Sequence, residues 1–391
     1  MLRLRAISAP LARGPRADWI LMAVTAALLV LGTVLVWSAT RDNAALVGDD
    51  PNAFLKRQLV NIAIGLTLAF LVAATDYRWV RILAPGIYVA SVVGLALVLV
   101  MGSTINGSRS WILVGPLSIQ PSEFAKLAVI AGMALIVAER AETRQGRVTD
   151  LDVTMMLAVA ALPAALIMLQ PDLGTMLVLS ATVFGVVAVS GAPRRWLVGL
   201  VVAAVLGAVA VVQLGLLKAY QLDRFLAFTN PALDPRGAGY NTEQARIAIG
   251  NGGVWGQGLF SGSQTTSGFV PEQQTDFVFT VAGEELGLVG AGILIVLLAV
   301  LLWRTLVIAR NAPDLFGRVA AAGIACWLGF QAFQNIGMCL GIMPVTGVPL
   351  PLVSYGGSSM FATLMAIGLL LNIQLRTDVS ALGLRRRFTG R

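Results

Sequence analysis

Residues 276–302 read DFVFTVAGEELGLVGAGILIVLLAVLL, an apolar run that begins with an aspartate. About 20 apolar residues are enough to cross the roughly 30 Å hydrocarbon core of a bilayer as a helix. The run follows a long polar loop, so Asp276 stands where the chain passes from water into lipid. The stretch therefore predicts a transmembrane helix with a carboxylate at its mouth.

The composition of the whole chain extends this prediction. Of the 391 residues, 57% are hydrophobic and 12% are charged, and the mean hydropathy is +0.81. A soluble domain does not need so many apolar residues, so the class is polytopic membrane protein. The sequence contains no histidine, which excludes histidine bases and histidine metal ligands. Any acid–base chemistry must therefore use Asp, Glu, Lys or Tyr.

Hydropathy predicts an all-α protein with about ten transmembrane helices. The predicted spans are residues 18–39, 58–75, 82–101, 121–139, 151–169, 173–190, 196–217, 276–302, 319–341 and 355–375. If the N-terminus is cytoplasmic, 19 of the 28 basic residues fall on the cytoplasmic side, as the positive-inside rule requires. Both termini are thus expected in the cytoplasm, with tails at residues 1–17 and 376–391. The net charge of +8 then reflects topology, and binding to nucleic acid is not expected.

We expect residues 1–391 to form a single transmembrane domain. The predicted outside loops are its chemically richer side. The largest loop, 218–275, is rich in glycine, which permits close backbone approach. It also contains an amphipathic piece, Asn241–Ile249, that is suited to the membrane interface. The loop 342–354 contains three prolines, which are incompatible with a regular helix. We expect this loop to be partly re-entrant.

Ionisable residues gather near the outer ends of the predicted spans. Glu123 and Lys126 have the i, i+3 spacing that places two side chains on one helix face. Ionisable groups at membrane depth are costly and usually face a cavity or each other. The same end of the bundle is expected to hold Asp276, Asp172, Arg57, Arg109 and Trp111. Such a set suits a substrate with a pyrophosphate and sugar hydroxyls.

Each of these residues also has a purely structural explanation. Asp276, Asp172 and Glu123 are predicted at helix N-termini, where carboxylates cap free N–H groups. Glu123 and Lys126 could form a local ion pair, and Arg57 could contact lipid headgroups. Trp111 could belong to the aromatic belt of the membrane interface.

Four blocks of sequence, in order along the predicted spans, resemble a known family. The chain resembles the SEDS proteins (shape, elongation, division and sporulation), which include RodA and FtsW of bacteria. Its sequence motifs are closest to those of the RodA branch. Two positions depart from the usual pattern: Ser110 separates Arg109 from Trp111, and Gln274 stands where a histidine is common. The blocks are Arg109-Ser-Trp-Ile with Gln120-Pro-Ser-Glu-Phe-Ala-Lys, Gln170-Pro-Asp-Leu-Gly-Thr, Pro271-Glu-Gln-Gln-Thr-Asp-Phe-Val-Phe, and Asn335-Ile-Gly-Met through Pro349-Leu-Pro-Leu-Val-Ser-Tyr-Gly-Gly-Ser-Ser.

The resemblance implies a peptidoglycan glycosyltransferase that polymerises lipid II at the outer face of the bacterial cytoplasmic membrane. It assigns Asp276 as the catalytic residue, and it implies a class B penicillin-binding protein as partner. A divalent cation, Mg²⁺ or Mn²⁺, is expected at the pyrophosphate, with Asp276 and Glu123 as candidate ligands. Glu123 would either ligate this cation or hold Lys126. The expected substrate-binding residues are Glu123, Lys126, Arg109, Trp111, Arg57, Gln120, Asp172 and Ser358.

Two other functions remain open from the sequence. A lipid II flippase would need polar residues through the full depth of the bilayer, whereas those of this chain gather in its outer half. A non-catalytic scaffold would explain the fold and leave the intramembrane charges without a role. The single helix of a partner is expected to pack near the small residues Gly283, Gly287 and Gly290, since small residues permit close helix approach in lipid.

Overall fold

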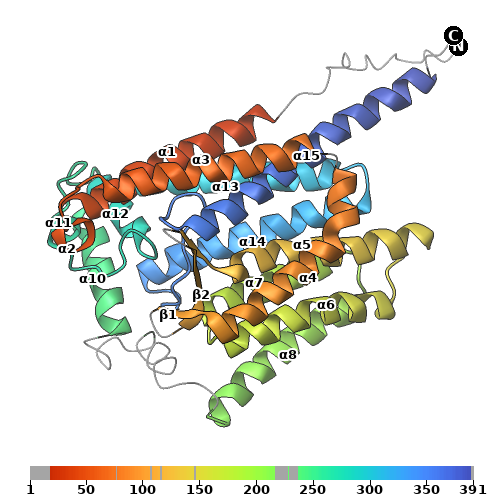
Figure 1. The fold of residues 1–391 in the computed structure, drawn as a ribbon, viewed down its shortest axis with the longest axis horizontal. Coiled ribbons are helices and arrows are strands. Elements are labelled where there is room, and N and C mark those ends of the chain that lie inside the picture. The colour runs from red at the N-terminus through yellow and green to blue at the C-terminus, as the bar shows by residue number, and fades with distance from the viewer. Residues whose placement is uncertain are drawn as a thin grey trace, which may run out of the picture.

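The computed structural model describes residues 18–388 except 76, 106–107, 115–116, 145–146, 216–227 and 229–236 (Figure 1). The helices in this part of the chain are α1 (Trp19–Arg41), α2 (Ala44–Val47), α3 (Ala53–Ala74), α4 (Tyr77–Met101), α5 (Pro121–Thr143), α6 (Asp150–Leu169), α7 (Leu173–Val189), α8 (Arg194–Gln213), α10 (Ala238–Asn251), α11 (Ser263–Ser267), α12 (Val278–Glu285), α13 (Gly287–Asn311), α14 (Leu315–Leu340) and α15 (Gly357–Phe388).

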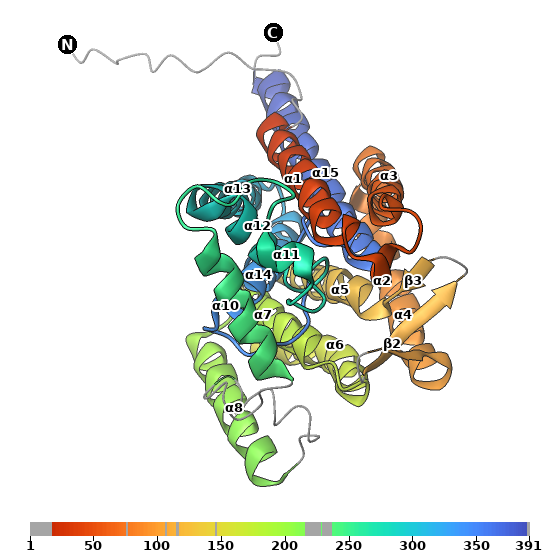
Figure 2. The same ribbon diagram turned by 90° about the vertical axis from the view of Figure 1, so that its left-hand side faces the viewer.

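The helical membrane fold is confirmed within the described residues. Nine helices there are long and apolar enough to cross a membrane, and α7 is apolar but shorter. In the best apolar windows of α5, α14 and α15, 72% of the residues are buried, whereas none is buried in that of α8. The core of the bundle therefore forms around α5, α14 and α15, and Figure 2 shows α8 at its edge.

Contacts between helix ends agree with a chain that crosses back and forth. At one end, Arg304 near the end of α13 donates to Asp18, which caps the start of α1. At the other end, Ser38 near the end of α1 donates to Glu285 at the end of α12. The number of crossings and the side that faces the cytoplasm remain predictions. The predicted tail 1–17 lies outside the described residues, and α15 continues through most of the predicted tail 376–391.

The loop 102–120, which was predicted to lie outside, differs from the all-helical expectation. It forms a small antiparallel sheet of three strands, β1 (Ser103–Ile105), β2 (Ser108–Val114) and β3 (Leu117–Ile119), in the order β1-β2-β3. Ile112 pairs with Ile119 across the second hairpin. Trp111 and the branched residues that follow it favour a strand, a local preference that the hydropathy argument did not consider.

The predicted eighth span, 276–302, is not one helix, and this part of the prediction was wrong. The chain forms α12, breaks at Gly287 with φ = +65°, and continues as α13. Backbone from residues 253–258 pairs with the break: Leu288 N–H donates to the Gly253 carbonyl, and Gln257 N–H donates to the Glu284 carbonyl. Groups that a continuous helix would pair internally are thus satisfied by the glycine-rich loop.

The same loop contains the predicted amphipathic piece, which forms part of α10. Ala245 and Ala248 are fully buried on one face of this helix, which packs against α12 and α14. An ideal Cβ on Gly283 of α12 would lie 2.9 Å from Ile249 of α10. The helix therefore buries one face against protein and does not lie free at the interface.

Residues 342–356, here called the re-entrant segment after the prediction, are irregular, as the prolines predicted, and residues 350–354 are buried. An ideal Cβ on Gly32, within α1, would lie 2.5 Å from the backbone of Val353. One on Gly174, in the first turn of α7, would lie 2.6 Å from the Thr346 carbonyl oxygen. Irregular backbone at membrane depth is tolerated where protein surrounds it, and here small residues on two helices make room for it.

Candidate functional site

Asp276 lies in a tight turn immediately before α12. The carbonyl of Glu272, a residue with φ = +50°, accepts from the N–H groups of Thr275 at 3.2 Å, Asp276 at 3.0 Å and Phe277 at 3.3 Å. The expectation that Asp276 opens a helix is therefore wrong, because the N-cap position belongs to Phe277 and has no side-chain cap. The carboxylate is half-buried.

This turn is fixed from two neighbouring elements. Asn335 of α14 donates to the Asp276 carbonyl at 2.7 Å and to the Val348 carbonyl at 2.8 Å. Tyr355 N–H donates to the Gln274 carbonyl at 2.9 Å. An ideal Cβ on Gly347 would lie 3.2 Å from Oδ2 of Asp276. The carboxylate is therefore held beside the re-entrant segment.

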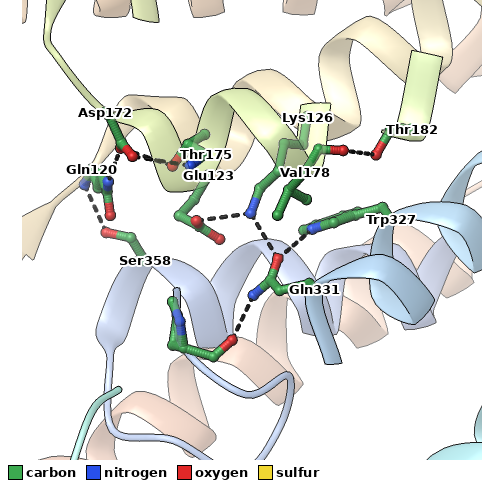
Figure 3. A network of polar contacts seen from close by, with 11 residues as sticks. Gln120, Glu123, Lys126, Asp172, Thr175, Val178, Thr182, Trp327, Gln331 and Ser358 are labelled. Carbon is green, nitrogen blue, oxygen red and sulfur yellow. Dashed lines mark hydrogen bonds and ion pairs between the residues drawn. The ribbon is translucent and has the colours of Figure 1, made fainter. Parts of the chain in front are cut away.

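Glu123 and Lys126 form the buried polar network drawn in Figure 3. Lys126 Nζ lies 2.8 Å from Oε1 of Glu123 and 2.9 Å from Oε1 of Gln331, and the two charged side chains are only 1% and 3% exposed. The indole of Trp327 lies 4.9 Å from the same ammonium and donates to Gln331 at 2.7 Å, a cation–π geometry. Glu123 and Lys126 therefore form a buried local ion pair, one of the two arrangements that the sequence suggested.

Gln331 and Asn335 of α14, one turn apart, link this pair to Asp276. Gln331 accepts from Lys126 and donates to the Pro349 carbonyl at 2.9 Å. Asn335 holds the adjacent Val348 carbonyl together with the Asp276 carbonyl. The ion pair and the catalytic candidate therefore attach to one stretch of the re-entrant segment, through one face of α14.

Gln120, Asp172 and Ser358 come together where α5, α7 and α15 begin. Gln120 N–H donates to the Ser358 hydroxyl at 2.8 Å, and the Gln120 amide donates to Asp172 at 3.1 Å. Asp172 also caps α7, since it accepts from Thr175 N–H at 2.9 Å and from the Thr175 hydroxyl at 2.7 Å. The structure thus brings together three residues that are far apart in sequence, and it confirms a capping role for Asp172.

The remaining predicted residues lie in separate elements. Arg109 in β2 is exposed and donates to the carbonyls of Gly102 at 2.8 Å and Val100 at 2.7 Å, which ties the sheet to the end of α4. Trp111 lies in the same strand and is half-buried. Arg57 is exposed over the ring of Phe54. Arg57 lies within α3 and does not precede it as predicted, because the helix begins at Ala53.

The contacts of α14 were missed by the sequence argument. Gln331, Gln334 and Asn335 are fully buried amides in an otherwise apolar span. Buried polar groups need hydrogen-bond partners, and these three find carbonyl or hydroxyl groups on neighbouring segments. Their i, i+3, i+4 spacing in an apolar run was the signal that could have identified a polar face.

The residues present fit a divalent cation only in a limited way. Among the described residues, no group of three or more His, Cys, Asp or Glu side chains could hold a metal ion. Glu123 Oε2 is buried and has no hydrogen-bond partner in this part of the chain. Mg²⁺ commonly binds through one or two carboxylates together with substrate phosphates. Glu123 therefore offers one carboxylate oxygen to a cation that would arrive with a phosphorylated substrate.

The glycines expected to receive a partner helix serve internal packing instead. An ideal Cβ on Gly287 would lie 2.3 Å from the Gly256 backbone nitrogen, and one on Gly283 would press on Ile249. One on Gly290 would lie 2.0 Å from Leu286 of the same segment. These positions already accommodate the glycine-rich loop and neighbouring side chains, and the face that a partner helix contacts remains a prediction.

The whole chain is similar in sequence to a family of known proteins. A family model for cell cycle proteins (FtsW, RodA and SpoVE) matches residues 18–378. Stage V sporulation protein E of Bacillus subtilis (strain 168) is 40% identical over 362 residues, covering 91% of this chain and 96% of that protein. Peptidoglycan glycosyltransferase MrdB of Escherichia coli (strain K12) is 36% identical over 356 residues, covering 91% of this chain and 93% of that protein.

A solved structure agrees with these sequence comparisons. A chain from work described as structural coordination of polymerization and crosslinking by a peptidoglycan synthase complex aligns with a TM-score of 0.77 and 38% identity. The alignment covers 92% of this chain and 98% of that chain. These identities do not single out the RodA branch that the sequence motifs indicated. They do show that this chain belongs to the FtsW, RodA and SpoVE family of cell cycle proteins, a family of multi-pass membrane proteins.

Proposed function

We propose that this protein is a peptidoglycan glycosyltransferase that polymerises lipid II at the outer face of the cytoplasmic membrane, for cell elongation and rod shape. The observation that carries the proposal is the half-buried Asp276 carboxylate on a turn fixed by α14 and the re-entrant segment. The similarity to MrdB, which is named a peptidoglycan glycosyltransferase, supports the same activity.

Asp276 acts as the general base in this proposal. Its carboxylate takes the proton from the 4-hydroxyl of the acceptor GlcNAc, and that oxygen forms a bond to the anomeric carbon of the donor MurNAc. The bond from this carbon to the polyprenyl pyrophosphate breaks, and the pyrophosphate leaves with the electron pair. Direct displacement converts the α-linked donor into a β-linked glycan. Hydrogen bonds to the turn backbone hold the base in place, as proton transfer requires.

Cations near the leaving group would stabilise the charge that develops there. Arg57 is the best placed for direct contact because its guanidinium is exposed at the outer end of α3. Arg109 already uses two donors on carbonyl groups of Val100 and Gly102. Lys126 is enclosed by Glu123, Gln331 and Trp327, so it contributes a fixed positive charge beneath the re-entrant segment.

A divalent cation, Mg²⁺ or Mn²⁺, belongs to the proposal as a companion of the pyrophosphate. Asp276 and Glu123 are the carboxylates that would hold it, and it would supply charge stabilisation for the leaving group when bound. The unpartnered Oε2 of Glu123 supports this assignment.

The proposed partner is a class B penicillin-binding protein, which would cross-link the glycan that this chain makes. The support is the similarity to a chain from a complex that coordinates polymerization and crosslinking. Membrane lipids cover the exposed apolar faces of α4 and α8, whose outward residues include Val89, Val93, Val201 and Val205.

The test is polymerisation of labelled lipid II by the purified protein with its partner transpeptidase. Wild type should yield glycan polymer, and Asp276→Asn should yield none while still inserting and binding the partner. The control is Asp50→Asn, which removes a carboxylate between α1 and α3 whose side chain is 45% exposed, and it should leave activity unchanged. A lipid II flippase is the alternative function: transport of lipid II across vesicle membranes without polymer would replace the proposal with it.

A further inference from the structure

Two adjacent glutamates in α12, Glu284 and Glu285, are almost completely buried. Ionisable groups buried in a helical membrane protein usually face a cavity or each other. Glu285 instead accepts from the Ser38 hydroxyl of α1 at 2.6 Å. Glu284 accepts from the chain at the start of α11, so both carboxylates bind other segments of the protein.

Glu284 is surrounded by donors from one short stretch. Its Oε1 accepts from Gln264 N–H at 2.7 Å and from the Ser263 hydroxyl at 3.3 Å. Its Oε2 accepts from Thr265 N–H at 3.0 Å and from the Thr265 hydroxyl at 2.7 Å. Hydrogen bonds to a charged acceptor are shorter and stronger than neutral ones, so Glu284 fixes the position and the hydroxyl direction of Thr265.

The fixed hydroxyl reaches the turn of Asp276 through Gln273. The Gln273 amide donates to Thr265 Oγ1 at 3.0 Å and to Thr280 Oγ1 at 3.2 Å. The Thr280 hydroxyl is itself committed, since it donates to the Phe277 carbonyl at 2.6 Å. Both threonine oxygens therefore act as acceptors for Gln273, which is only 3% exposed and lies in the middle of the turn.

We propose that Glu284 is a positioning residue for the glycosyltransferase reaction, acting on Asp276 through Thr265 and Gln273. Asn335 and Tyr355 hold the turn from the side of the re-entrant segment. The chain from Glu284 holds it from the opposite side, where the glycine-rich loop meets α12. The inference rests on the proposed function, in which Asp276 is the base.

The direction of the hydrogen bonds makes this inference specific. Glu284 accepts the Thr265 proton, so Thr265 Oγ1 is left to accept from Gln273. Gln273→Glu keeps the side-chain size but places an acceptor against two oxygens whose protons are already donated elsewhere. Thr265→Val keeps the shape and removes the connecting hydroxyl, whereas Thr265→Ser keeps it.

The experiment compares these variants in the lipid II polymerisation assay with the partner transpeptidase present. Thr265→Val and Gln273→Glu should lower kcat on the order of tenfold to a hundredfold, because a small displacement of a catalytic group is costly. KM for lipid II should stay within about twofold of wild type, since substrate contacts are retained. Thr265→Ser should restore kcat. Thr266→Val, which removes a neighbouring hydroxyl bonded to the Gly262 carbonyl, should have no effect.

Amide hydrogen exchange provides a readout that does not depend on activity. The amides of Thr275, Asp276 and Phe277, which bond to the Glu272 carbonyl, should exchange faster in Thr265→Val than in wild type. Faster exchange combined with an inactive wild type would contradict the proposed function and leave the positioning chain intact. Unchanged exchange, or full kcat in both Thr265→Val and Gln273→Glu beside an active wild type, would overturn the inference.

Discussion

Removal of Lys126 should destabilise the protein more than removal of Glu123, even though the two form one ion pair. Lys126→Met leaves Glu123, 3% exposed, with no hydrogen-bond partner among the described residues. Glu123→Met leaves the ammonium with Gln331 Oε1 at 2.9 Å and the Trp327 ring at 4.9 Å. An uncompensated buried charge costs about 3–5 kcal/mol, so Lys126→Met should lose about that much unfolding free energy. We expect about 1–3 kcal/mol for Glu123→Met, in which the remaining charge keeps two partners.

The double variant Glu123→Met with Lys126→Met separates stability from chemistry. Replacing a whole buried ion pair with apolar side chains of similar size is often neutral or stabilising. The double variant should therefore unfold within about 1 kcal/mol of wild type. If the charge of Lys126 is needed for the leaving pyrophosphate, this stable protein should still polymerise lipid II poorly.

The assay is unfolding in mixed micelles titrated with denaturing detergent, followed by tryptophan fluorescence, with polymerisation measured in parallel. Lys56→Met is the matched control. Its ammonium lies 2.8 Å from Asp50, the same distance as in the buried pair, but the two side chains are 69% and 45% exposed. No measurable loss is expected there, because exposed pairs are screened by water. Equal losses for Lys126→Met and Glu123→Met, or a double variant as unstable as Lys126→Met, would refute the argument.

Three further predictions follow from particular residues. A reporter fused after Arg391 should be cytoplasmic, and Ser267→Cys, an exposed position in α11, should react with an impermeant maleimide from outside; the reverse pattern would invert the topology. Gly287→Leu should abolish accumulation of folded protein, because its φ is +65° and a Cβ would lie 2.3 Å from backbone. Gly292→Leu in the same helix should accumulate normally, because a Cβ there would have no neighbour within 4 Å. Asp172→Ala should cost about 1–2 kcal/mol as a lost helix cap and should retain polymerisation, as measured by unfolding and by the lipid II assay; complete loss of product would assign Asp172 a role in the chemistry.

Local signals made several parts of the structure predictable. The spans follow from apolar runs, since a bilayer leaves backbone groups no partner outside a helix. Glu123 and Lys126 could be paired from their i, i+3 spacing alone, and the structure confirms the pair at 2.8 Å. Asp172 could be assigned as a cap because the cap bond is made to Thr175, three residues ahead.

Other features depend on contacts between residues far apart in the chain. Hydropathy treated residues 276–302 as one apolar run, and only the pairing of residues 253–258 with Gly287 and its neighbours explains why the helix breaks there. The exposed positions of Arg57 and Arg109 depend on where α3 begins and on a sheet that hydropathy does not detect.

The sequence by itself determined the membrane class and the residues that could carry charge, because both depend on composition or on spacing within one helix. Only the tertiary structure decided how Asp276 is held. Its turn is held by Asn335 of α14 and by Tyr355 of the re-entrant segment. Within the turn, Gln273 bonds to Thr265. No local sequence pattern specifies such partners. The physical reason is that buried polar groups must pair with whatever the packing of the helices brings near.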